Sequence, residues 1–142
     1  MVEEKKLSKK MSGYNTGIAS EYYVLSLLYR LGYEAYITIG NKKSVDIRVV
    51  KEEQTITIDV KAVQGYSSLI VNNVSSKHNH YIIFLIYNNK FEDISVLPDI
   101  YVVPSADISK IEKIFKDQKR VFKGDILSYK DNWQCLFSTQ TL

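Results

Sequence analysis

The chain lacks several features that would point to other classes of protein. Cys135 is the only cysteine in 142 residues, so no intrachain disulfide can form, as expected of a protein in the reducing cytoplasm. No run of about 18 apolar residues is present, so we expect no membrane-spanning helix. Residues 1–10 lack the apolar core of a secretory signal peptide. These observations together favour a cytoplasmic protein. Neither a glycine-rich phosphate-binding loop nor a Ser-His-Asp arrangement is visible, so neither a P-loop nucleotide site nor a Ser-His-Asp hydrolase site is predicted.

What the chain does contain is enough apolar sequence for a core. Hydrophobic residues make up 45% of it, with many Ile, Val and Tyr, which argues against disorder. Its length predicts a single domain over residues 1–142, in which residues 1–12 form a flexible basic arm. The net charge of +3 permits nucleic-acid binding but does not by itself indicate it.

Charged residues on two consecutive predicted strands are the most informative feature. Alternation along the strand at 55–63 puts Asp59 and Lys61 on one face and Ile58 on the other. Asp46 opens the preceding strand, 45–50, on the face opposite its apolar residues. If the strands pair as a hairpin, two carboxylates and an ammonium converge on one spot. Because close carboxylates repel, a hard cation such as Mg²⁺ is expected between them.

A helix predicted over residues 15–31 adds a third acid. Asn15 or Thr16 would cap its start, and Gly32 would end it. Helical winding puts Glu21 beside Leu25 and Leu28, near the middle of the face expected to be buried. The polar side would carry Ser20, Ser26 and Arg30. Glu21 is either a rim residue whose head reaches water or a carboxylate directed at the strand pair, and the second interpretation explains a charge that is otherwise misplaced.

These motifs together resemble the PD-(D/E)xK nuclease superfamily. The resemblance covers residues 13–64 and is carried by Gly17-x-x-x-Glu21, Gly32-Tyr33, Asp46 and Asp59-Val60-Lys61. It implies an α/β fold with a restriction-endonuclease-like αβββαβ core, a mixed central sheet flanked by helices. It also implies that Glu21, Asp46, Asp59 and the Val60 carbonyl bind Mg²⁺, or Mn²⁺ in its place, while Lys61 orients the attacking water. Val45 stands where the superfamily has its name-giving proline.

The implied function is Mg²⁺-dependent hydrolysis of phosphodiester bonds in DNA. The Gly17…Glu21 start is similar to archaeal Holliday junction resolvases, whereas residues 101–104 and 129–133 look more like small bacterial and intron-encoded endonucleases. One site cuts one strand, so a homodimer or higher oligomer is expected for duplex or junction cleavage. The alternative is a catalytically silent nuclease-fold module that binds DNA or a protein partner. A purely structural interaction protein would explain neither Glu21 nor the spacing from Asp46 to Lys61.

Several basic and polar residues are candidates for supporting roles. Lys42 and Lys43, in the turn before Asp46, and Lys9 and Lys10, near the N-terminus, are predicted to contact DNA phosphates. Gln64 and Tyr66 are candidates of second rank at the end of the Asp-x-Lys strand. The basic cluster at 113–123 is interpreted as a solubilising surface.

The rest of the chain reads as scaffold. Strands are predicted at 34–39, 81–87 and 101–103, with 81–87 buried on both faces because its apolar run is continuous. A short helix is predicted around 67–74, and a longer one from Asp107 or Ser109 to about residue 117. His78 and His80 are interpreted as loop or strand-end histidines rather than metal ligands, because no Cys or third His accompanies them.

Overall fold

The computed structural model describes residues 2–39, 45–65 and 68–137, with side chains from Gly13 onward. Lys42, Lys43 and Tyr66 lie outside the described residues, and Lys9 and Lys10 are described only in their backbone. The roles assigned to these residues therefore stay predictions.

A mixed five-stranded sheet forms the centre of the protein. Its strands, in the spatial order β1-β2-β3-β5-β6, are β1 (Glu34–Ile37), β2 (Ile47–Lys51), β3 (Gln54–Val63), β5 (His80–Ile86) and β6 (Asp99–Pro104). Only β3 and β5 pair in parallel, and the other neighbours are antiparallel. Every residue of β5 is buried, which confirms the strand predicted from the apolar run.

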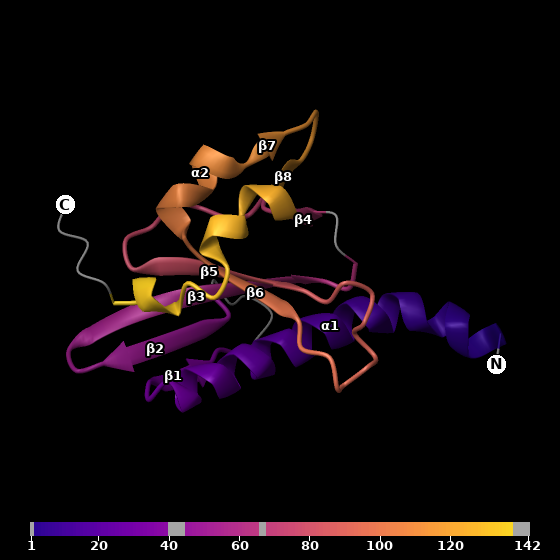
Figure 1. Ribbon diagram of the computed structural model, residues 1–142, viewed down its shortest axis with the longest axis horizontal. Helices are drawn as coiled ribbons and strands as arrows, with labels where there is room; N and C mark the ends of the chain where they lie inside the picture. Colours follow the sequence, from indigo (N-terminus) through magenta and orange to yellow (C-terminus); the bar gives the residue numbers. More distant parts are fainter. Residues whose placement is uncertain (1, 40–44, 66–67, 138–142) are drawn as a thin grey trace.

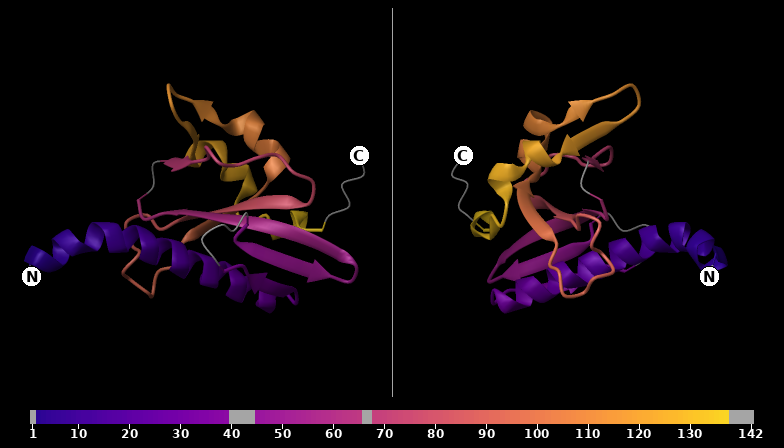
Figure 2. Two further views of the ribbon diagram at one scale, coloured as in Figure 1. Left: turned by 180° about the vertical axis from the view of Figure 1, so that it is seen from behind. Right: turned by 45° about the vertical axis from the view of Figure 1, so that its right-hand side comes forward.

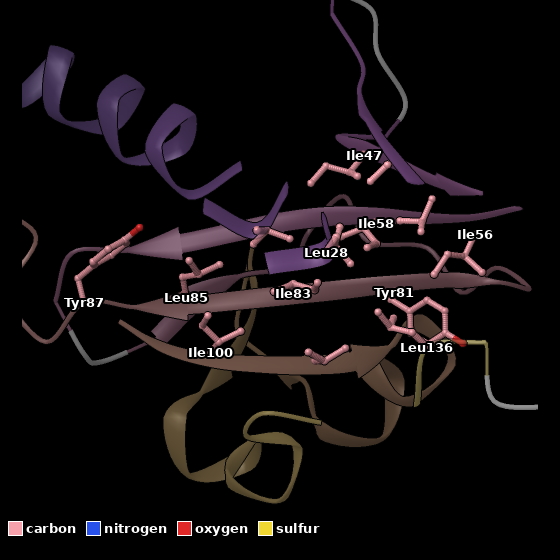
Figure 3. Close-up of a cluster of buried hydrophobic side chains, with 14 residues drawn as sticks. Leu28, Ile47, Ile56, Ile58, Tyr81, Ile83, Leu85, Tyr87, Ile100 and Leu136 are labelled. Carbon is pink, nitrogen blue, oxygen red and sulfur yellow. The ribbon is translucent and has the colours of Figure 1, made fainter. Parts of the chain in front are cut away.

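Different elements cover the two faces of this sheet (Figures 1 and 2). The helix α1 (Val2–Arg30) lies on one face, where its Leu28 packs with Ile58 and Ile83 (Figure 3). A small three-stranded sheet lies over the other face, with the order β4 (Ser68–Ile70), β8 (Lys119–Phe122) and β7 (Lys113–Ile114). Among the described helices, none has the length and apolar character needed to cross a membrane.

The second helix of the expected αβββαβ core is not found among the described residues. The chain between β3 and β5 contains the short strand β4 where a helix around 67–74 was predicted. The helix predicted to reach residue 117 was also wrong in extent, because α2 spans only Ile108–Ile111. Ile114 and Phe115, expected on its inner face, are 73% and 50% exposed, and the chain instead turns back to pair β7 with β8. Pairing between strands has overridden the local helical pattern.

The N-terminal helix is longer than predicted, and a different side of it faces the sheet. It begins at Val2 rather than at Asn15 or Thr16, so the expected flexible arm is helical in this structure. Gly32 does end it, with a φ of 91° that favours glycine. The residues buried against the sheet follow a spacing of four: Thr16, Ser20, Val24 and Leu28. Ser20 was therefore assigned to the wrong side, since it is fully buried and shares a 2.8 Å hydrogen bond with the Tyr87 hydroxyl.

Candidate functional site

The antiparallel ladder between β2 and β3 ends at the pair Ile47 and Ile58. Just before it, the Asp46 amide donates to the Ile58 carbonyl at 3.1 Å. The Asp46 carboxylate then accepts a hydrogen bond from the Val60 amide, with 2.8 Å between Oδ2 and N. A side chain thus takes the position that a backbone carbonyl would occupy if the ladder continued. The two strands separate at this point, and a carboxylate is held against the backbone of β3.

Val60 presents both of its backbone groups to this opening. In an extended strand, the N–H and C=O of one residue point to the same neighbouring strand. Since the Val60 N–H points to Asp46, its carbonyl faces the same edge, beyond the last ladder pair. The opening is therefore bordered by one carboxylate and one peptide carbonyl, both oxygen donors.

Asp59 and Lys61 flank Val60 and point to the face that carries the small sheet. The alternation of β3 fixes this orientation, since Ile58 and Val60 pack in the α1-side core whereas Val63 packs in the core under the small sheet. The Asp59 side chain is 20% exposed and the Lys61 residue is half-buried. Lys61 makes no ion pair with any residue that the structure describes.

His80, at the start of β5, holds Asp59 in place. Its Nε2 lies 3.3 Å from Asp59 Oδ2, and its Nδ1 lies 2.7 Å from the Thr57 hydroxyl. Because a carboxylate only accepts, Nε2 donates the hydrogen bond to Asp59, and the Thr57 hydroxyl is the partner of Nδ1. His80 is only 3% exposed. It is a strand-end histidine, as interpreted from the sequence, but its contact with Asp59 was missed. The available signal was a polar residue opening a strand that is otherwise wholly apolar.

Glu21 approaches from the other side of the sheet. It is half-buried on α1, beside the stripe that packs on Ile56 and Ile58, whereas Asp59 emerges on the opposite face of β3. Within the described parts of the chain, no group of three or more His, Cys, Asp or Glu side chains is placed to share a metal ion. The structure therefore places the Asp46 carboxylate at the opening and Asp59 next to Val60 on β3. The convergence of Asp46, Asp59 and Glu21 on one metal site stays a prediction.

Gln64 connects the end of β3 to α1. Its side-chain amide donates to the Thr16 hydroxyl at 2.7 Å. Together with the bond between Ser20 and Tyr87, this contact fixes the part of α1 that carries Glu21. Gln64 thus contacts the helix rather than Lys61.

The donor atoms at the opening fit a hard divalent cation. The Asp46 carboxylate and the Val60 carbonyl are oxygen ligands of the kind that Mg²⁺ takes, and Mg²⁺ commonly uses one or two carboxylates and completes its shell with water. His80 contacts Asp59 Oδ2, and a histidine partner of this kind is common for carboxylates that bind metals. On this chemistry, Asp46 and the Val60 carbonyl could hold an ion, and Asp59, the preceding residue of β3, is the candidate for a further ligand.

Comparison of the whole structure with solved structures identifies the fold. The bacterial homing endonuclease I-Ssp6803I is similar with a TM-score of 0.57 at 11% sequence identity, over 84% of this chain and 87% of that one. The Holliday junction resolvase Hjc of Archaeoglobus fulgidus is similar with a TM-score of 0.53 at 13% identity, over 78% of this chain and 86% of that one. By sequence, no protein-family model and no curated protein matches. The chain has the restriction-endonuclease-like fold of PD-(D/E)xK nucleases, as the sequence motifs predicted.

Proposed function

We propose that the protein is a divalent-metal-dependent endonuclease that hydrolyses phosphodiester bonds in DNA. The observation that carries the proposal is the interrupted ladder, where the Asp46 carboxylate binds the amide of Val60, the residue between Asp59 and Lys61. This arrangement occurs in a fold that is shared with a homing endonuclease and a Holliday junction resolvase. The two similarities support DNA as the substrate and leave junction and site-specific cleavage as two candidate activities.

Each residue has a distinct proposed role. A bound Mg²⁺ or Mn²⁺ would polarise the phosphate and lower the pKa of a coordinated water. Asp46 and Asp59 hold the negative charge that attracts the ion, and His80 keeps the Asp59 carboxylate oriented. Lys61 orients the water and stabilises the charge that develops on the phosphate oxygens. Glu21 is proposed as a further carboxylate at the same centre.

A cleavage panel tests the proposal. Supercoiled plasmid, linear duplex, single strand and a four-way junction are incubated with the protein in Mg²⁺, in Mn²⁺ and in EDTA. We expect ion-dependent cleavage of at least one DNA form by the wild-type protein and none by Asp59→Asn. Arg30→Gln is the control, since it removes an exposed charge at the end of α1. Ion-independent cleavage, or equal cleavage by Asp59→Asn, would contradict the assignment.

A silent nuclease-fold module that binds DNA or a protein partner is the second candidate. It is favoured by the finding that no three potential metal-binding side chains come together among the described residues. If the wild-type protein binds DNA but cleaves no form of it with either ion, this candidate replaces the first.

We also propose a homodimer as the active form, because each chain carries one candidate site. A row of exposed side chains runs along the outer side of α1: Tyr14, Ile18, Tyr22 and Tyr29 are 71%, 39%, 56% and 53% exposed. When roughly 200 Å² per aromatic side chain is scaled by these exposed fractions, symmetric pairing of the rows buries less than a standard interface does, so we propose that DNA assists the pairing. Sedimentation with and without duplex should show a dimer that Tyr22→Glu weakens, and identical sedimentation of both proteins would rule out this surface.

A further inference from the structure

Between the central sheet and the small sheet lies an open hollow of about 420 Å³. Residues 60–63 of β3 form one wall, and residues 68–70 of β4 with Arg120 of β8 form the other. Figure 1 shows the small sheet stacked over this face of β3 and β5. Lys61 in the β3 wall lies two residues from Asp59 on the same face of β3, or about 7 Å along the strand.

Two cations that form no ion pair within the described part of the chain line this hollow. Three lysines of the adjacent segment are ion-paired: Lys113 with Asp125 at 3.6 Å, Lys119 with Glu112 at 3.9 Å, and Lys123 with Asp99 at 3.7 Å. Arg120 forms no ion pair with any described residue, and neither does Lys61. Lys116 of the same basic cluster likewise makes no ion pair with a described residue, so what distinguishes Arg120 is its position at the hollow.

The Arg120 guanidinium is held in a fixed orientation by neutral groups. Its Nη1 donates to the Ser68 hydroxyl at 2.8 Å, and its Nε donates to the Gln118 side-chain carbonyl at 2.9 Å. A guanidinium has five N–H donors in a planar fork, so these two bonds leave others for a ligand. A planar, oriented fork beside an ammonium is suited to an anion with several oxygens, and a phosphodiester matches it through paired hydrogen bonds.

We propose that this hollow binds a backbone phosphate of the DNA strand, adjacent to the phosphate that is held at Asp46 and Asp59. Arg120 and Lys61 supply the charge, and Ser68 orients the Arg120 fork. The small sheet, which replaces the expected second helix, then serves to bring Arg120 over β3. This inference rests on the proposed function and adds a DNA-contacting residue for which the sequence motifs gave no role.

The test is DNA binding measured without divalent ions, so that no cleavage occurs. Dissociation constants of a fluorescently labelled duplex are measured over a series of salt concentrations for wild type, Arg120→Gln and Arg30→Gln. The control removes the same side chain and charge from an exposed position on α1. Loss of one phosphate contact should lower the slope of log affinity against log salt by about 0.9, with weaker binding at low salt. Arg30→Gln should leave the slope unchanged.

Two further variants separate a phosphate contact from a structural effect. Arg120→Lys keeps the charge but loses the fork, so it should retain the slope and bind less tightly. Ser68→Ala leaves Arg120 in place, and it should likewise weaken binding without changing the slope. If Arg120→Gln matches wild type, or if Arg30→Gln lowers the slope equally, the proposal is overturned. Wild-type cleavage together with an unaffected Arg120→Gln would refute only this site, whereas a wild type that neither binds nor cleaves DNA would refute the proposed function itself.

Discussion

The two polar contacts of His80 can be removed one at a time. Glutamine extends an amide nitrogen to about the position of imidazole Nε2, so His80→Gln keeps a donor for Asp59 and loses the partner of Thr57. Asparagine reaches only as far as Nδ1, so His80→Asn keeps the Thr57 contact and leaves Asp59 without its donor. Both variants are neutral amides in a buried position, which makes them matched controls for each other. We predict that His80→Asn weakens metal binding and that His80→Gln largely preserves it.

The expected size follows from the contact between His80 and Asp59. Removing an outer partner of a metal ligand typically lowers metal affinity 10- to 100-fold. At a Mg²⁺ concentration ten times the wild-type Kd, the ion stabilises the folded protein by about 1.4 kcal/mol, and a tenfold weaker site gains only about 0.4 kcal/mol. For a chain of this length each kcal/mol corresponds to about 3 °C in Tm, so a rise of about 4 °C should fall to about 1 °C.

The assay is thermal unfolding in EDTA and in Mg²⁺, followed by circular dichroism. Both variants should melt below wild type in EDTA, because each loses a buried hydrogen bond worth about 1 kcal/mol or more. Only the increment caused by Mg²⁺ distinguishes them. Equal increments in the two variants would refute the claim that His80 acts through Asp59, and a missing increment in wild type would refute the metal site.

Three other outcomes are expected. Lys61→Ala should lower the single-turnover cleavage rate about a hundredfold or more. Its DNA affinity should fall by no more than the loss of one phosphate contact would cause. A smaller loss of rate would exclude Lys61 from the chemistry. Burial raises the pKa of Cys135 to about 11, so at pH 8 about 0.1% of it is thiolate, and its alkylation should be far slower than in guanidinium-unfolded protein. Burial opposes ionisation of Asp99, but hydrogen bonds from Asn88 and Lys130 outweigh it and lower the pKa of Asp99. The charged Asp99 carboxylate stabilises the fold at pH values above its unfolded pKa near 3.9, and this stabilisation is lost as the pH falls through its lower folded pKa. In Asp99→Asn, Tm should therefore change less with pH between these two pKa values.

The strands could be predicted because the burial of their faces determines the pattern of apolar residues along the sequence. Alternation identified β2 and β3, and the continuous apolar run identified β5, since each pattern follows from which faces of a strand are covered. The same reasoning failed on α1. Burial of Ser20 depends on the Tyr87 hydroxyl, 67 residues away, and a local pattern contains no record of that partner. Residues 108–115 have helical spacing, but only Ile108–Ile111 form a helix, because Lys113 and Ile114 pair with Arg120 and Lys119.

The candidate site was predictable to the same extent. Asp46, Asp59 and Lys61 follow from strand periodicity and the β2–β3 hairpin, which are properties of a short segment. His80 and Arg120 depend on longer-range pairings, His80 on the parallel register that sets it opposite Thr57 and Arg120 on the small sheet. Such registers are fixed by tertiary packing and cannot be derived from the spacing of residues in the sequence.

Val45 shows how this chain keeps its sheet open without the usual proline. A proline before the first acid has no N–H and so cannot extend the ladder. Valine has one, so the interruption must be maintained in another way. Here the Thr38 hydroxyl donates to the Val45 carbonyl, the Thr38 amide donates to the Asp46 carbonyl at 2.9 Å, and the Asp46 carboxylate occupies the Val60 amide. These bonds tie residues 45 and 46 toward β1 and fill the next ladder position on β3. The carboxylate that would bind the metal therefore also creates the opening in which the metal would sit.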